Sequence, residues 1–80
     1  MYSTIISWGK NRETVFEPVT DDTIWNLIAR LQSLWNANVT TENFSAKIMN
    51  DEKLMYDGPI NQFVIDGFRY NVMKEMMNNG

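Results

Sequence analysis

Residues 21–38 read DDTIWNLIARLQSLWNAN, and this stretch decides the predicted fold. Its apolar residues recur at three- and four-residue steps, the spacing of one face of an α-helix. They are Ile24, Leu27, Ile28, Leu31, Leu34 and Trp35. Asp21 is a favourable N-cap residue, and Asp22 in a first turn suits the positive end of the helix dipole. The sequence therefore predicts an amphipathic helix over about 22–37 that covers one face of a sheet.

The segment before this helix predicts two antiparallel strands. Residues 2–8 read YSTIISW and alternate with a period of two, which is typical of a strand with one buried face. Residues 9–12 are a polar turn that contains Gly and Asn, and residues 13–17 resume a strand. Because Pro18 cannot donate to a ladder of hydrogen bonds, it ends this strand or places it at a sheet edge. We expect a β-hairpin over residues 2–17.

Two further strands are predicted after the helix. Residues 40–43 are a polar connection, and residues 44–49 read FSAKIM, which alternates again. The polar residues 50–52 form a turn, and residues 53–56 form a short return strand. Asp-Gly-Pro at 57–59 is expected to end this strand. The predicted order is strand, strand, helix, strand, strand, which makes a single α+β domain with one helix on an antiparallel sheet.

The last third of the chain supports two interpretations. Asp66-Gly67 lies between two alternating segments, which is a hairpin signal and would bring Phe63 opposite Tyr70 on one side of a sheet. The alternative is a second helix that starts at Pro59, where an interior Gly67 would cost about 1 kcal/mol. We favour the hairpin, with residues 72–78 as a short Met-rich helical end or tail.

Composition argues against several classes of protein. The 80-residue chain has no His and no Cys, and its formal net charge is −3. Its seven basic residues are scattered, whereas a nucleic-acid-binding protein concentrates them, so direct nucleic-acid binding is disfavoured. The sequence also contains no signal peptide and no apolar run of about 20 residues, so we expect no membrane partner and a cytoplasmic location.

Catalysis is also disfavoured by the residue types that are present. Nucleophile–histidine arrangements are impossible without His and Cys, and no glycine-rich phosphate-binding loop occurs. Asp51, Glu52 and Asp57 lack the spacing of a calcium loop, so we expect no metal and no cofactor. Asp21 and Asp22 could form an acid–base pair, but helix capping is the simpler interpretation of these two residues. We therefore expect a binding protein and not an enzyme.

Aromatic and methionine side chains are the best candidates for a binding surface. The chain carries three Trp, three Tyr, four Phe and six Met, and such residues supply both cores and contact surfaces. Trp8 and Trp25 lie at the edges of predicted elements, where packing competes with a role as an anchor. Met73, Met76 and Met77 would share a helical face that needs cover, from the domain or from a second copy in a homodimer. The carboxylates Asp21, Asp51, Glu52 and Asp57 complete the set of candidate partner-binding residues.

Three short stretches carry a resemblance to a known group of proteins. They are residues 7–13 (SWGKNRE), residues 46–53 (AKIMNDEK) and the Asp-Gly at 57–58, with a Trp-bearing helix after the first. Together with the element order, they resemble small early proteins of T-even-type phages, such as the antitoxin against a host RNase toxin. The resemblance covers residues 2–58 and implies a compact inhibitor of a host protein, a class that also includes anti-CRISPR proteins. It implies no functional residues.

The sequence thus leads to a first hypothesis with two alternatives. The first is a phage or mobile-element protein that binds a host defence or regulatory protein and blocks it sterically, with its carboxylates meeting a basic cleft. The second is a structural or assembly subunit, which would associate with itself. The third is a nucleic-acid-binding module that stacks bases on Tyr2, Trp8 and Phe16.

Overall fold

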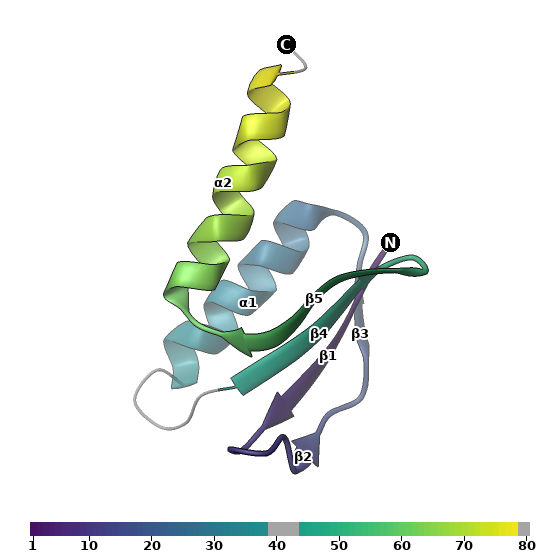
Figure 1. The fold of residues 1–80 in the computed structure, drawn as a ribbon, viewed down its shortest axis with the longest axis vertical. Helices are drawn as coiled ribbons and strands as arrows, with labels where there is room; N and C mark the ends of the chain where they lie inside the picture. The colour runs from purple at the N-terminus through teal and green to yellow at the C-terminus, as the bar shows by residue number, and fades with distance from the viewer. Residues whose placement is uncertain (39–43, 79–80) are drawn as a thin grey trace.

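The structure, a computed structural model, describes residues 1–38 and 44–78, which form five strands and two helices (Figure 1). In chain order these are β1 (Tyr2–Trp8), β2 (Thr14–Val15), β3 (Val19–Asp21), α1 (Ile24–Asn38), β4 (Phe44–Asn50), β5 (Lys53–Ile60) and α2 (Gln62–Asn78). All strand pairs are antiparallel, and α1 lies on one face of the sheet. The predicted α+β class is therefore confirmed. The polar connection predicted at 40–43 lies outside the described residues.

The sheet is built around β1. β4 pairs with the full length of one side of β1, and β5 pairs with the far side of β4. β2 and β3 share the other edge of β1, with Thr14 opposite Trp8 and Asp21 opposite Tyr2. The predicted N-terminal hairpin is confirmed, but its second strand is shorter than expected and is followed by an additional strand. Pro18 lies in the break between them, since proline has no N–H to donate to β1.

β5 continues past the point where the sequence predicted its end. Pro59 lies within β5, opposite Ser45 of β4. β5 is an edge strand, and an edge strand tolerates proline because one of its two sides makes no ladder bonds. The hydroxyl of Tyr56 donates a hydrogen bond of 2.6 Å to the carbonyl oxygen of Pro59. The expectation that Asp-Gly-Pro ends this strand is therefore wrong. β5 extends to Ile60, and α2 follows it directly.

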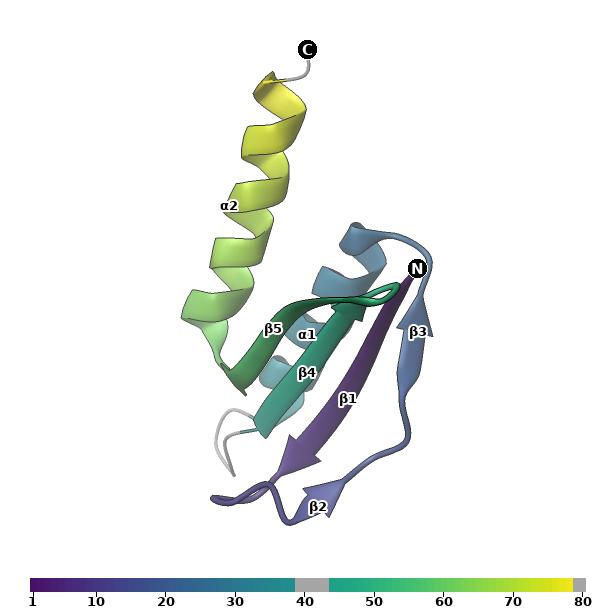
Figure 2. The same cartoon turned by 45° about the vertical axis from the view of Figure 1, so that its right-hand side comes forward.

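The core lies between one face of the sheet and the two helices, which both lie on that side (Figures 1 and 2). Its buried apolar side chains come from three strands and both helices: Ile6, Leu27, Ile28, Leu31, Phe44, Ala46, Ile48, Ile60 and Ile65. Three of these belong to the predicted stripe of α1, and the other three stripe residues are half-buried against the cluster. The predicted amphipathic helix is therefore confirmed.

The start of α1 differs from the expectation in one respect. The backbone N–H of Asn26 donates to Oγ1 of Thr23 at 3.1 Å, which makes Thr23 the N-cap. Asp21 instead ends β3, and the first turn of α1 contains no acidic residue, so Asp22 precedes the helix. The capping roles assigned to Asp21 and Asp22 are wrong because Asp21 is drawn into the sheet by its pairing with Tyr2 of β1.

The C-terminal third is a helix, so the favoured hairpin is wrong and the alternative of a second helix is confirmed, except that it begins at Gln62 and not at Pro59, which lies in β5. Oδ1 of Asn61 accepts a hydrogen bond of 3.0 Å from the N–H of Val64, which caps α2. Ile65 is fully buried in the core, with Phe68 and Val72 half-buried beside it at helical spacing. Burial of these side chains outweighs the helical cost of Gly67, which is about 1 kcal/mol. A Cβ at Gly67 would meet nothing within 4 Å, so this residue faces open space.

Candidate protein-binding surface

Helix α2 carries a group of exposed apolar side chains that we call the α2 face. Its members are Phe63, Tyr70, Met73, Met76 and Met77, which are all at least half exposed. Phe63 is 86% exposed and Met77 is 80% exposed, values that are unusual for side chains of this size. Three of the five recur every seven residues, which aligns them along one side of a helix. Exposed apolar stripes of this kind are typical of interaction surfaces.

The α2 face widens toward the C-terminus of the helix. Figures 1 and 2 show the C-terminal half of α2 rising beyond the end of the sheet and beyond α1. At 100° per residue, Met76 and Phe63 lie about 140° apart around the helix axis. Met76 lies on the same side of the helix as the buried Ile65. Met76 is nevertheless 61% exposed, because it lies past the body of the domain. The projecting end of α2 therefore presents apolar groups in more than one direction.

Two of the four charged residues of α2 pair with each other. The guanidinium of Arg69 donates a hydrogen bond of 3.0 Å to Asp66, which also accepts one of 2.9 Å from the side-chain amide of Gln62. Lys74 joins Tyr70, Met73 and Met77 around a shallow depression on the outer side of the helix. The α2 face is therefore apolar with one basic residue, and its chemistry favours contact with another protein surface.

The four candidate carboxylates do not form a joint surface. Asp21 is buried and paired with Arg30 of α1. Asp51 accepts a hydrogen bond of 3.1 Å from the N-terminal ammonium of Met1, and Asp57 accepts one of 2.6 Å from Arg12. Glu52 is exposed in the turn between β4 and β5. Three of the four carboxylates are thus paired with a cation within the chain. Because these negative charges are already compensated within the chain, they attract a basic cleft of a partner less strongly.

The two candidate tryptophans lie in different surroundings. The ring centroid of Trp8 lies 5.0 Å from that of Phe44 and 6.3 Å from that of Phe16, so Trp8 closes the core at the end of β1. Trp25 is 41% exposed in the first turn of α1. Trp8 has a packing role, and Trp25 is an isolated exposed side chain on an element other than α2.

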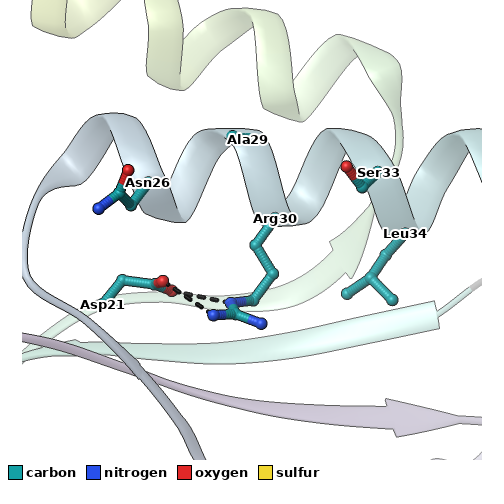
Figure 3. A pocket seen from close by; sticks show the side chains of 6 residues that line it. All are labelled: Asp21, Asn26, Ala29, Arg30, Ser33 and Leu34. Carbon is teal, nitrogen blue, oxygen red and sulfur yellow. Dashed lines mark hydrogen bonds and ion pairs between the residues drawn. The ribbon is translucent and has the colours of Figure 1, made fainter.

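A second hollow lies beside α1 and contains an ion pair (Figure 3). Nε and Nη2 of Arg30 donate to the two carboxylate oxygens of Asp21, each at 3.0 Å. The hydrogen bond to Asp21 raises the pKa of Arg30, burial lowers that pKa, and the negative charge of Asp21 raises it again. The pair ties α1 to β3. The remaining lining residues are Asn26, Ala29, Ser33 and Leu34, which leave the hollow wide open to solvent.

Sequence reasoning identified part of the α2 face and missed the rest. Met73, Met76 and Met77 were candidates, and the structure brings them together on one helix. Phe63 and Tyr70 were missed because the favoured hairpin placed them opposite each other on one side of a sheet. A signal was present in the sequence, since Phe63, Tyr70 and Met77 recur at seven-residue intervals. That spacing has meaning only if the segment is helical.

Other types of site have little support in the described part of the chain. No three His, Cys, Asp or Glu side chains among residues 1–38 and 44–78 lie close enough together to hold a metal ion. Neither described helix is long and apolar enough to cross a bilayer. No protein-family model matches the sequence, and neither the curated proteins nor the solved structures contain a significant match. The resemblance to small early phage proteins therefore stays a prediction.

Proposed function

We propose that this protein is a non-catalytic binding protein that inserts the projecting part of α2 into an apolar groove of a partner protein. The observation that carries the proposal is the α2 face. Its apolar side chains extend around about 140° of the helix, so a groove buries them more completely than a flat surface does. Recognition of a helix in a groove uses anchors at helical spacing, and Phe63, Tyr70 and Met77 supply such anchors.

We further propose that binding inhibits the partner protein. A phage or mobile-element inhibitor of a host defence or regulatory protein would need a contact surface and no active site. The chain's size, its lack of His and Cys and its resemblance to small early phage proteins support that role. The mechanism is steric occlusion of the partner. It depends on α2 and not on the carboxylates, because Asp21, Asp51 and Asp57 already have cationic partners within the chain.

A site-specific photocrosslink tests where the partner binds. Phe63 is replaced by the photoreactive residue benzoylphenylalanine, which keeps an aromatic side chain at a position that is 86% exposed. The control places the same residue at Phe16, which is 50% exposed on the opposite edge of the sheet. We expect a crosslinked adduct of defined mass from Phe63 in a host-cell lysate, and much less of it from Phe16. Equal yields of the same adduct from both positions would contradict the proposal.

Affinity measurements on the purified pair then test the mode of binding. We expect a 1:1 complex that the double variant Tyr70→Ser, Met77→Ser weakens by about 100-fold, since each anchor contributes about tenfold or more. The matched control is Leu54→Ser on β5, another half-exposed apolar side chain, which should leave the affinity unchanged. An unchanged affinity of the double variant would overturn the proposal. Light scattering that shows a homodimer of the chain alone, abolished by the double variant, would assign the α2 face to a second copy instead.

A further inference from the structure

A cleft of about 360 Å³ lies on the side of α2 opposite Tyr70 and Met77 of the α2 face. It opens where α2 passes the end of the sheet at which β1 begins and β4 ends. Its α2 wall consists of Phe68, Asn71, Val72 and Glu75, which follow one another at helical steps. Its other wall consists of Tyr2, Ile24, Asn50 and Met55. The volume is at the low end of the range of ligand pockets, about 300–1,000 Å³, which suits one side chain or another small group.

The polar groups of the cleft have unused hydrogen-bonding capacity. The side chains of Asn50, Asn71 and Glu75 form no hydrogen bond and no ion pair within the described residues. Asn71 and Glu75 stand on α2 one helical turn apart, whereas Asn50 faces them from the end of β4 beside Tyr2. Acceptor oxygens therefore line both walls. Two aromatic rings and three aliphatic or thioether side chains supply the apolar remainder of the lining.

The charge of the cleft determines whether an anionic or a cationic ligand is attracted to it. Glu75 is the only charged residue among the eight that line the cleft. The nearby N-terminal ammonium of Met1 is already paired with Asp51 at 3.1 Å. Lys53 lies opposite Asn50 in the strand register, but it is exposed and is not part of the lining. An anion would be repelled by Glu75 without a compensating cation, whereas a cation would be attracted.

We infer that this cleft binds a guanidinium group, as carried by an arginine side chain of another polypeptide. A guanidinium has five N–H donors in a planar fork, which suits several acceptor oxygens, whereas an ammonium is a compact point charge. Its plane can stack on the aromatic rings of Tyr2 and Phe68, and its aliphatic stem can lie along Ile24 and Val72. The inference goes beyond the proposed function, because it concerns a different side of α2 and a charged ligand.

The test uses the full chain labelled with ¹⁵N and a small probe. N-acetyl-arginine-N-methylamide is titrated while the side-chain amide signals of Asn50 and Asn71 are followed by NMR. The matched probes are the citrulline analogue, which has nearly the same shape without the charge, and the lysine analogue. We expect saturable shifts of both amide signals with arginine, and binding of the other two probes weaker by about tenfold. Equal binding of citrulline or of lysine would overturn the guanidinium assignment.

Variants separate this site from the α2 face. Glu75→Gln should weaken arginine binding about tenfold, to the level of citrulline. Glu17→Gln removes the same charge from an exposed position outside the cleft and should leave binding unchanged. The double variant Tyr70→Ser, Met77→Ser should bind arginine as the unmodified chain does, so a failure of the proposed function would not affect this result. Arginine binding that is insensitive to Glu75→Gln would overturn the inference.

Discussion

Arg30 of α1 forms a bidentate ion pair with Asp21 of β3, with both N···O distances at 3.0 Å. The two partners differ in their surroundings, because the side chain of Asp21 is 7% exposed and that of Arg30 is 39% exposed. Bidentate pairs of this kind fix orientation as well as adding energy. The pair thus fastens the last residues before α1 to the helix itself, at the point where the chain leaves the sheet edge.

The asymmetry of this pair leads to a first prediction. Arg30→Met should destabilise the protein by about 2–3 kcal/mol, because it leaves a buried carboxylate without its cation. Asp21→Asn should cost less, about 1–2 kcal/mol, because water can still reach the guanidinium. The double variant should recover part of the loss, since neither charge is then left alone. Urea unfolding of all four proteins measures this cycle, and strictly additive losses would contradict the coupling.

A second prediction concerns pH. The hydrogen bond to Asp21 raises the pKa of Arg30 in the folded state. A raised pKa contributes stability that is complete below the unfolded-state pKa and is lost as the pH rises through the folded-state pKa. The folded-state and unfolded-state pKa values of arginine both lie far above the neutral range. The difference in unfolding free energy between the unmodified protein and Arg30→Met should therefore stay constant between about pH 6 and pH 10. A decrease toward the alkaline end would show that another group titrates with the pair.

A third prediction uses Gly67 to test the conformation of the C-terminal third. Gly67→Ala should stabilise the protein by about 0.5–1 kcal/mol, because alanine is the better helix former and its Cβ would meet open space. In a type I′ turn the same change would destabilise, since that turn needs a positive φ. The control is Gly9→Ala: Gly9 has a φ of 98° and a Cβ there would collide with Glu13. Thermal unfolding should show the two changes moving Tm in opposite directions.

A fourth prediction concerns Thr4 in the core face of β1. Its hydroxyl Oγ1 is buried and has no hydrogen-bond partner within the described residues. Thr4→Val keeps the shape of the side chain and removes the unsatisfied polar atom, so it should stabilise the protein by about 1 kcal/mol. Thr20→Val on β3 is the matched control, because Thr20 is exposed and should change stability by less than about 0.5 kcal/mol. A loss of stability in Thr4→Val, measured by urea unfolding, would mean that the hydroxyl is satisfied in solution.

Local sequence signals were sufficient for the elements around α1. The period-two pattern of residues 2–8 and the three- and four-residue steps of the α1 stripe each correspond to one repeating geometry. The burial of Ile6, Leu27 and Leu31 follows directly from those periods. The N-cap was misplaced by two residues, from Thr23 to Asp21, because both are good capping residues and pairing with β1 decides between them.

The sequence by itself determined the α+β class, the antiparallel order of its strands and the buried side of α1, because periodicity and burial are linked along each of these segments. Only the tertiary structure decided the conformation of residues 62–78. There the hairpin signal of Asp66-Gly67 competed with burial of Ile65 in the core by a helix, and long-range packing outweighs a local turn preference. Because of that outcome, Phe63 and Tyr70 are not cross-strand neighbours, as the hairpin predicted, but members of the exposed α2 face. The helix also brings Asn71 and Glu75 into one cleft with Asn50. These residues are more than 20 positions away from Asn50 in the sequence and meet it only in the folded chain.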